Sequence, residues 1–301
     1  MKIQKITILG AGALGLMFGK KLSEFYGNDN VKFLADDERK KRYLKDGFMV
    51  NGKSFFPNFI SNLDDKVDFL IVALKANALE DGLCLAKSFV SKKTIVISLL
   101  NGVTSEEIIA KTLNLAPLFC VAQGMDATKI KRELSYTKEG AIVIGEKDKS
   151  ISNRLNGIKE CLQNAGICVE IAGDIVLHQW SKFMLNCGVN QVLAIYKAPY
   201  ELIQKDSDER KLMIEVMEEV RSLAVRMGIN LGKNDIKKWL DIIDSLNPKG
   251  YPSMVQDVLA KRKTEVEIFA KTAVELGDKF GIKMPLNKML YEKIVNLEKS
   301  F

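Results

Sequence analysis

A glycine-rich segment close to the N-terminus constrains the fold of this chain more strongly than any other feature. The segment Gly10-Ala11-Gly12-Ala13-Leu14-Gly15 has the spacing G-x-G-x-x-G. It follows a short apolar run at residues 5–9 and precedes residues 14–25, where apolar side chains recur at helical spacing. This order predicts the first unit of a parallel sheet that binds a dinucleotide, with the six loop residues beside its phosphates. The alternative is an ordinary turn between a strand and a helix, without a ligand.

Further apolar runs continue this pattern through the first half of the chain. Residues 31–35, 67–74 and 94–99 are predicted to be strands, and the nearly continuous apolar run at 67–74 is typical of a strand buried on both faces. Strands that alternate with helical segments predict a parallel sheet with crossover helices. Two later short strands, at residues 141–144 and 167–171, are predicted to extend or edge the same sheet.

After Gly173 the pattern changes to helices alone. Apolar residues recur every three or four positions, and segments rich in proline and glycine interrupt them. We therefore predict an α/β Rossmann-type domain over residues 1–173 and an all-α domain over residues 174–301. The predicted helices cover residues 175–193, 211–227, 233–243, 254–280 and 286–297.

Residue counts exclude several classes of protein. The single histidine, His178, excludes a metal site with several histidine ligands, and five cysteines without a C-x-x-C pair argue against a zinc site or a disulfide framework. Free thiols indicate a reducing cytoplasm. No apolar run approaches the ~18 residues that span a bilayer, and the first residues do not form a signal peptide. The net charge of +7 is spread along the chain, which favours anionic small molecules over nucleic acid.

The residues after the second predicted strand bear on the choice of cofactor. A carboxylate at this place accepts hydrogen bonds from the ribose hydroxyls of NADH and repels the 2′-phosphate of NADPH, so Asp36 favours NADH. Arg39 and Lys40 follow within one turn, and they could bind that phosphate instead. A third interpretation is that Asp36 only caps the next helix.

Three polar residues interrupt an otherwise apolar predicted helix in the second half of the chain. Lys182, Asn186 and Asn190 are spaced four residues apart and would share one helix face. Two asparagines inside a helix oppose its intrinsic propensity. We therefore expect this face to line a cleft, and a solvated surface is the alternative.

With these motifs in place, the sequence resembles the ketopantoate reductase (2-dehydropantoate 2-reductase) family over nearly its whole length. That family has an N-terminal Rossmann domain and a helical C-terminal domain of the 6-phosphogluconate-dehydrogenase type. The resemblance depends on several motifs that occur in the family's order. They are the glycine loop, Leu74-Lys75-Ala76, Asn101-Gly102, Tyr136 to Glu146, the W-x-K-x-x-x-N-x-x-x-N segment that starts at Trp180, Ser253-Met254-Val255-Gln256-Asp257, and Arg262-Lys263-Thr264-Glu265.

The resemblance implies roles for the residues of the second half. It implies that Lys182 is the general acid, which protonates the developing alkoxide, and that Glu265 is the carboxylate that works beside it. Asn186 and Asn190 are implied to bind the substrate hydroxyl, and Ser253 the substrate carboxylate. For Ser253 a helix N-cap after the preceding proline is an alternative or an additional role.

Two residues of the first half also receive roles from the resemblance. Asn101 is implied to lie near the nicotinamide and the ketone, as a catalytic and cofactor-binding residue. Lys75 is implied to lie near the cofactor and the substrate carboxylate. The alternative for both is turn formation at the end of a strand. His178 is expected to be structural, which leaves Lys182 as the proton donor.

The implied function is the reduction of ketopantoate to (R)-pantoate in pantothenate and coenzyme A biosynthesis, with NADPH, the family's usual cofactor, or with the NADH that Asp36 favours. Two departures weaken the substrate assignment: residues 249–252 lack an asparagine that some members carry, and residues 268–271 replace an acidic-aromatic stretch. The alternatives are a reductase of another 2-keto acid and, more remotely, a non-catalytic dinucleotide-binding protein. We expect a cytoplasmic protein without nucleic-acid or membrane partners, and a homodimer through the helical domains is compatible with such folds.

Overall fold

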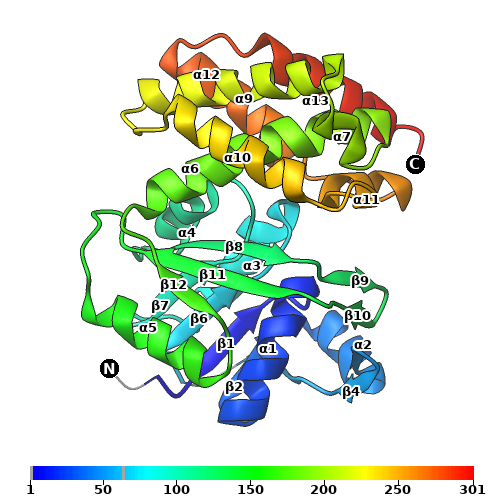
Figure 1. Ribbon diagram of the computed structural model, residues 1–301. Coiled ribbons are helices and arrows are strands. Elements are labelled where there is room, and N and C mark those ends of the chain that lie inside the picture. The colour runs from blue at the N-terminus through cyan, green and yellow to red at the C-terminus, as the bar shows by residue number, and fades with distance from the viewer. Residues whose placement is uncertain (1–2, 63–64) are drawn as a thin grey trace. The chain divides into compact units, whose positions relative to one another are not determined.

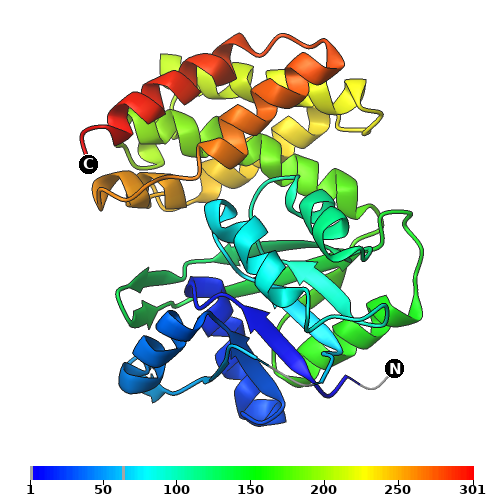
Figure 2. The same ribbon diagram turned by 180° about the vertical axis from the view of Figure 1, so that it is seen from behind.

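The chain divides into two compact units, Met1–Ile175 and Val176–Phe301. A computed structural model describes residues 3–62 and 65–301, and Figures 1 and 2 show it from opposite sides. The sequence places the boundary slightly earlier, between residues 173 and 174. Ile175 groups with the first unit because it packs against Gly145, where an added Cβ would lie 2.7 Å from the Ile175 side chain.

The first unit is built on a parallel sheet with the strand order β5-β2-β1-β6-β7 (Figure 1). All four neighbouring pairs in this sheet are parallel. The order reverses at β1, as in doubly wound dinucleotide-binding folds, so the predicted α/β class is confirmed. The strands are β1 (Ile6–Leu9), β2 (Val31–Leu34), β5 (Asn58–Ile60), β6 (Phe69–Val72) and β7 (Ile95–Ser98).

Alternate residues of these strands face two separate cores. Ile8 and Ile71 pack in a core that includes α1 and α5, whereas Leu9 and Val72 pack in another that includes α3 and α4. In Figure 1 α1 lies in front of the sheet, and α3 comes to the front in Figure 2. Burial on both faces explains the continuous apolar runs. The helices of this unit are α1 (Ala13–Tyr26), α2 (Asp37–Asp46), the short 3₁₀ helix η1 (Ala76–Ala78), α3 (Leu79–Ala86), α4 (Ser105–Leu113) and α5 (Asn153–Asn164).

Two smaller sheets complete the first unit, with the orders β4-β3-β10-β9 and β12-β11-β8. The strands predicted at 141–144 and 167–171 are present as β11 and β12, but the prediction that they extend the main sheet is wrong. The reason is β8, which pairs antiparallel with β11 in a separate sheet, while Leu118, the residue before β8, forms an isolated parallel bridge with Ile97 of β7. The remaining strands are β3 (Phe48–Val50), β4 (Lys53–Phe55), β8 (Phe119–Met125), β9 (Thr128–Ile130), β10 (Glu133–Ser135), β11 (Glu139–Gly145) and β12 (Val169–Ile171).

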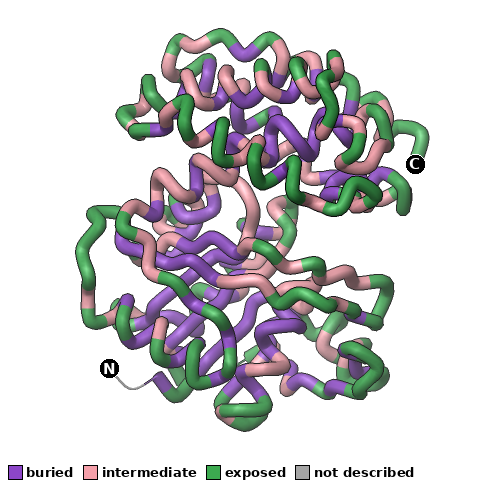
Figure 3. Tube along the Cα trace, viewed as in Figure 1, coloured by how far each residue is buried: buried purple, intermediate pink, exposed green. Residues whose placement is uncertain are grey.

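The second unit, all of which the structure describes, contains helices and no strand, as predicted. Its central helix is α9 (Asp208–Arg226), which contacts α7, α8, α10, α12 and α13. Met213, Met217, Val220 and Ala224 of α9 are fully buried at helical spacing, and Figure 3 shows the corresponding buried interior. The other helices are α8 (Glu201–Gln204), α10 (Lys233–Ser245) and α13 (Pro285–Glu298).

The helix predicted over 175–193 is present but contains a wider turn. It consists of α6 (Ile175–Leu185), one π-helical turn η2 (Asn186–Asn190) and α7 (Gln191–Tyr196). A π turn keeps the chain helical, so the apolar pattern does not reveal it.

The single helix predicted over 254–280 is wrong. The chain forms α11 (Ser253–Leu259), an irregular stretch, a second π-helical turn η3 (Glu267–Lys271) and α12 (Thr272–Phe280). Lys261 ends the first helix with a positive φ of 51°. Because a lysine rather than a glycine takes this conformation, the sequence carries no mark of the break.

Candidate active site

The carboxyl ends of the parallel strands form one edge, and four of the predicted site residues follow it. The register pairs Leu9 with Leu34 and with Val72, and pairs Val72 with Ser98. These four residues therefore lie in a row across neighbouring strands, which are about 4.8 Å apart. The crevice beyond such an edge, at the strand where the order reverses, is where ligands bind in doubly wound sheets. The predicted residues one to three positions beyond the row are Gly10, Asp36, Lys75 and Asn101.

Two of the three loop glycines are required by the protein's own packing. Gly10 has a φ of +113°, and a Cβ added there would lie 2.6 Å from the Ala73 carbonyl oxygen. A Cβ on Gly15 would lie 2.2 Å from the Gly10 carbonyl oxygen. Neither position accepts a side chain without movement of the backbone. These two glycines therefore account for the tight turn and for the close approach of α1 to β1.

Gly12 is different, because its backbone does not require a glycine and its neighbours crowd an added Cβ less than at Gly10 or Gly15. Its φ of −75° suits any residue, and the nearest atom to an added Cβ is the Ala73 carbonyl oxygen at 3.3 Å. Gly12 is also the N-cap of α1, with no capping side chain and no acidic residue in the first turn. The absence of a side chain at the N-cap and the N–H groups of the helix N-terminus suit a pyrophosphate, so the residues present fit a dinucleotide.

Asp36 caps helix α2, as one interpretation of the sequence expects, and this leaves its role toward the cofactor open. Its Oδ1 accepts a hydrogen bond from the backbone N–H of Arg39 at 2.7 Å, and its Oδ2 lies 3.5 Å from the Arg39 guanidinium. Both side chains are about half exposed. The cap does not conflict with a ribose contact, because a carboxylate has further acceptor positions.

Lys75 and Asn101 occupy the loops after β6 and β7. Lys75 is exposed, and its carbonyl oxygen accepts the N–H of Ala78 at 3.0 Å in the turn that begins η1. Asn101 is half-buried and precedes Gly102, which has a φ of +94°. Turn formation at the strand end therefore occurs at both places, and it leaves the predicted ligand roles open.

In the second unit Lys182 lies on α6, and Asn186 and Asn190 begin and end the π turn η2. Lys182 is half-buried, whereas each asparagine is only 7% exposed. Polar side chains with this degree of burial do not form a solvated face, so that alternative is wrong for the two asparagines. π turns are rare and are frequent at functional sites.

Ser253 lies beside Asn190. The Asn190 Nδ2 donates to the Ser253 Oγ at 3.5 Å, the outer limit of a hydrogen bond. Pro252 is the N-cap of α11, and no side chain caps this helix. The interpretation of Ser253 as a capping residue is therefore wrong, and its exposed hydroxyl is available for a ligand.

Glu265 lies in the irregular stretch just before the π turn η3, and the two π turns contact each other. The residue before it is fixed firmly, because Glu298 Oε1 accepts both the N–H of Thr264 at 2.7 Å and its hydroxyl at 2.6 Å. The structure thus brings Asn190 and Ser253 into contact and holds the Glu265 segment in the same unit. Sequence reasoning missed the supporting residues Glu298, Gln191 and Asn287, because each acts through a partner far along the chain.

These features define a class, the dinucleotide-binding oxidoreductases with a Rossmann-type unit and a helical unit. Comparison with protein families is specific: the description "Ketopantoate reductase PanE/ApbA" matches residues 6–149, and its C-terminal counterpart matches residues 174–298. The 2-dehydropantoate 2-reductase of Archaeoglobus fulgidus is 28% identical over 99% of each chain. The chain belongs to the ketopantoate reductase family, whose members are nicotinamide-dependent oxidoreductases of 2-keto acids.

Solved structures show the same fold. A PanE/ApbA family ketopantoate reductase from Ralstonia eutropha JMP134 has a TM-score of 0.85 at 21% identity, covering 98% of this chain and 99% of that one. A D-mandelate dehydrogenase, solved as a ternary complex with NADH and anilino(oxo)acetate, has a TM-score of 0.83 at 24% identity, again covering 98% and 99%. Within residues 3–62 and 65–301, no helix is long and apolar enough to cross a membrane.

Proposed function

We propose that this protein reduces ketopantoate to (R)-pantoate with a nicotinamide dinucleotide, in the biosynthesis of pantothenate and coenzyme A. The observation that carries the proposal is the buried π turn, which displays Asn186 and Asn190 one and two turns after Lys182 in a full-length member of this family. A buried amide pair beside a lysine suits a small polar substrate that receives a proton. Glu265 completes the proposed catalytic set.

The bound dinucleotide and the residues of the site share the steps of the proposed reaction. The bound dinucleotide supplies the hydride. Lys182 gives a proton to the carbonyl oxygen of the substrate and stabilises negative charge there as it forms. Asn186 and Asn190 bind the substrate hydroxyl through their amides, and the Ser253 hydroxyl binds the carboxylate. Orientation of the two reactants supplies much of the rate.

The first unit is proposed to hold the dinucleotide. Gly10 to Gly15 bind the pyrophosphate, while Lys75 and Asn101 extend toward the nicotinamide end. For the ribose we propose NADH over NADPH, because the Asp36 carboxylate is placed just beyond β2 and would repel a 2′-phosphate. Arg39 is the competing group, since its guanidinium lies beside the same carboxylate.

The decisive experiment follows nicotinamide absorbance with ketopantoate as substrate, using NADH and NADPH in parallel. We expect turnover with ketopantoate and a loss of kcat of about 10²- to 10⁴-fold in Lys182→Ala, the range that a general acid contributes. Dinucleotide binding should survive in that variant. Wild-type protein without turnover would refute the proposal, and Lys182→Ala with near-wild-type kcat would refute the assignment of the acid.

Another 2-keto acid is the second candidate substrate. The observation that favours it is that Ile268-Phe269-Ala270-Lys271 replaces the acidic-aromatic stretch. All four residues belong to the turn η3, and the first three are buried. A panel of 2-keto acids of increasing side-chain size, measured by kcat/KM, decides between them. Ketopantoate should give the highest value.

We also propose that the protein acts as a homodimer in the cytoplasm. All five cysteines are free thiols, which suits a reducing compartment. Light scattering after size-exclusion chromatography tests the oligomeric state, since the chain mass is 33.7 kDa.

A further inference from the structure

A buried chain of amide side chains supports the π turn η2. Gln191 and Asn287 both have 0% exposure and lie on α7 and α13. The Gln191 Nε2 donates to the Cys187 carbonyl oxygen at 2.8 Å and to the Asn287 Oδ1 at 3.4 Å. The Asn287 Nδ2 donates in turn to the Glu219 Oε2 at 2.8 Å. We call Gln191, Asn287 and Glu219 the amide relay.

The charge of Glu219 fixes the direction of every bond in the relay. An ionised carboxylate only accepts hydrogen bonds, and Glu219 also accepts the backbone N–H groups of Leu286 at 2.8 Å and Asn287 at 3.0 Å. The Asn287 amide must therefore point its Nδ2 to Glu219 and its Oδ1 to Gln191. Both N–H groups of the Gln191 amide are then engaged.

The relay ends on the π turn η2, at the Cys187 carbonyl oxygen. In an α-helix the N–H of Gln191 would bond to the Cys187 carbonyl four residues earlier. Here that N–H bonds to the Gly188 carbonyl, and the Gln191 side chain bonds to Cys187 in its place. The turn is also tightly packed, because a Cβ added to Gly188 would lie 2.6 Å from the Met217 Cγ.

The environment of Cys187 agrees with this picture. Its side chain is fully buried, burial raises the pKa of its thiol well above the usual value, and the Glu219 carboxylate adds to the rise. The thiol is thus a neutral packing group. The polar contacts of the π turn on this side come from the relay.

We propose that Gln191 and Asn287 are positioning residues for substrate binding, an inference that rests on the proposed function. The relay holds η2 in the π conformation, and that conformation sets the direction of the Asn186 and Asn190 amides. Neither Gln191 nor Asn287 touches substrate or cofactor. Relaxation toward a regular α-helix would change the rotation between Asn186 and Asn190, and misplacement by about 1 Å costs as much as 10²-fold in rate.

Gln191→Met tests the proposal, because methionine keeps the volume and removes both donated bonds. It leaves the Cys187 carbonyl and the Asn287 Oδ1 without this donor, so the thermal midpoint should fall, as it should in the control below, and removal of the unpartnered Gln191 Oε1 offsets part of that loss. We expect the KM for the 2-keto acid to rise about 10-fold, with the KM for the dinucleotide unchanged. Hydrogen exchange should show faster exchange at residues 186–191.

Gln204→Met is the matched control. The Gln204 Nε2 also donates to two backbone carbonyl oxygens, of Ile243 at 2.8 Å and Leu246 at 2.9 Å, but it ties α8 to the end of α10. We expect a lower thermal midpoint with an unchanged KM for the 2-keto acid. Equal KM values for the 2-keto acid in Gln191→Met and wild type would overturn the positioning role of the relay. A wild-type protein that reduces no 2-keto acid would instead overturn the proposed function.

If Gln191→Met folds poorly, two variants that exchange the carboxylate and the amide of the Glu219–Asn287 contact test the proposal instead. Asn287→Asp places a second carboxylate against Glu219 and should raise the KM for the 2-keto acid. Adding Glu219→Gln restores a donor to the new carboxylate and removes the charge repulsion, although its amide nitrogen then faces the backbone N–H of residue 287. We expect the double variant to recover part of the lost kcat/KM. A double variant no better than Asn287→Asp would overturn the proposal.

Discussion

Gly12 is the residue at which the structure separates folding from ligand binding most cleanly. Contacts within the chain exclude a side chain at Gly10 and Gly15, whereas an added Cβ at Gly12, at the start of α1, would meet only the Ala73 carbonyl oxygen, at 3.3 Å. Gly12→Ser keeps the helix capped, because serine is a preferred N-cap. Its side chain would fill the space proposed for the pyrophosphate. We expect the KM for the dinucleotide to rise about 10-fold, which corresponds to ~1.4 kcal/mol, with a smaller loss of thermal stability than in Gly10→Ala, because the added Cβ would lie 3.3 Å from the Ala73 carbonyl oxygen.

Two further glycine variants control this experiment. Gly173 is exposed, and nothing lies within 4 Å of an added Cβ there. Gly173→Ser should therefore change neither the KM for the dinucleotide nor the thermal stability. Gly10→Ala should lose stability by at least ~2 kcal/mol, because an L-residue is strained at a φ of +113°. A Gly12→Ser enzyme that binds the dinucleotide normally would remove the glycine loop from the proposed site.

Asp36 combines two roles that a single substitution separates. Asp36→Ser retains a capping oxygen for the Arg39 N–H but removes the negative charge. We expect the ratio of kcat/KM for NADPH to that for NADH to rise at least about 10-fold, while the thermal midpoint stays constant. Steady-state kinetics with both cofactors measures the ratio. Asp36→Ala controls for the cap and should lower stability by about 1 kcal/mol. An unchanged ratio in both variants would show that Asp36 does not select the cofactor.

At the scale of the elements, the predictable parts of this fold are those with a strong local pattern. Residues 67–74 predicted β6 because both faces of that strand are buried, and the glycine loop marked the start of α1. The three-residue strands β3, β4 and β5 carry no periodic pattern of their own, so their ladders form only through tertiary pairing. The π turns escape prediction for a related reason: they preserve the apolar face on both sides and shift it by one residue.

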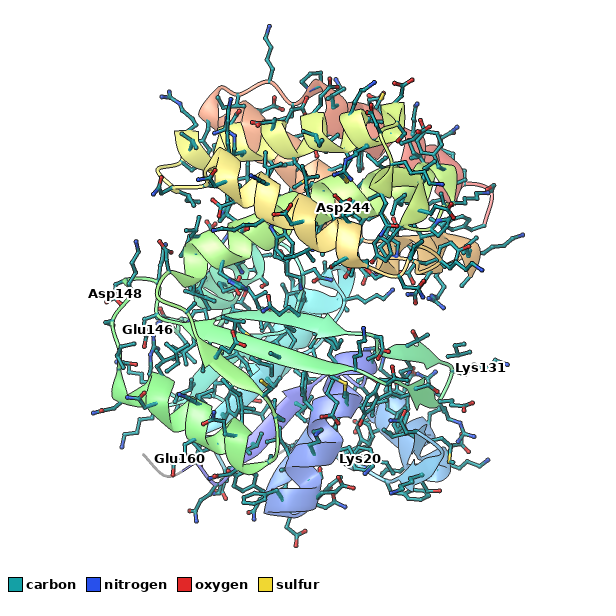
Figure 4. The ribbon with its side chains drawn as sticks, in the orientation of Figure 1. Lys20, Lys131, Glu146, Asp148, Glu160 and Asp244 are labelled. Atoms are coloured by element: carbon teal, nitrogen blue, oxygen red, sulfur yellow. The ribbon has the colours of Figure 1, made fainter. Side chains whose placement is uncertain are left out.

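The link between β11 and α5 gives a prediction about pH. The Arg154 guanidinium holds the pKa of the Glu146 carboxyl below its usual value, helped by the Ser152 hydroxyl. Arg154 bonds to both carboxylate oxygens, at 2.7 and 2.5 Å, and Figure 4 shows Glu146 where the chain leaves β11. A lowered folded-state pKa stabilises the protein above the unfolded pKa, and this stabilisation is lost as pH falls through the folded value. Glu146→Gln should therefore cost about 2 kcal/mol at pH 7, and progressively less as pH falls from the unfolded-state pKa to below the lowered folded-state pKa.

Urea unfolding of both proteins between these pH values measures the difference. Glu160→Gln is the control, because this exposed carboxylate lies on α5 in the same region of Figure 4. Its free energy of unfolding should stay within about 0.5 kcal/mol of the wild-type value at every pH. A Glu146→Gln penalty that persists unchanged in acid would mean that shape, and not charge, stabilises this link.

The clamp between α13 and the Glu265 segment gives another element-scale prediction. Glu298→Ala removes the acceptor of both Thr264 bonds and releases the backbone beside Glu265. We expect kcat to fall about 10-fold through loss of orientation, with the KM for the dinucleotide unchanged. Glu298→Gln keeps one acceptor oxygen and should recover part of the activity. Glu292→Ala, an exposed change on the same helix, should have no effect. Full activity in Glu298→Ala would show that the clamp does not position Glu265.

At the scale of the whole molecule, the sequence proposes the residues of the candidate site but not the contacts that support them. Lys182, Asn186 and Asn190 lie close together in the sequence, and the parallel strands explain why Gly10 and Asn101 share an edge. The supports of the site are of another kind. Gln191 and Asn287 are 96 residues apart, and no local pattern pairs an amide on one helix with an amide on another. Only the packed core defines such a pair.

The division into two units predicts how the chain unfolds when the dinucleotide is bound. Each unit has its own buried core, and the proposed dinucleotide site belongs to Met1–Ile175. A ligand at 100 times its Kd stabilises the state that binds it by ~2.7 kcal/mol. Both tryptophans, Trp180 and Trp239, lie in the second unit, where Trp239 donates to the Ser181 hydroxyl at 2.8 Å. Tryptophan fluorescence therefore reports on the second unit alone.

We accordingly expect the dinucleotide to raise the midpoint of amide exchange in β1 and β6 during urea unfolding, while the fluorescence midpoint stays where it is. In the Gly12→Ser variant the same dinucleotide concentration should no longer shift the amide-exchange midpoint, and the fluorescence midpoint should again stay unchanged. Equal shifts by both probes in wild type would contradict independent unfolding, because they would show that the stabilisation reaches Val176–Phe301 as fully as the unit that binds the ligand. No shift by either probe would contradict dinucleotide binding itself, since a ligand that binds only the folded state must stabilise it.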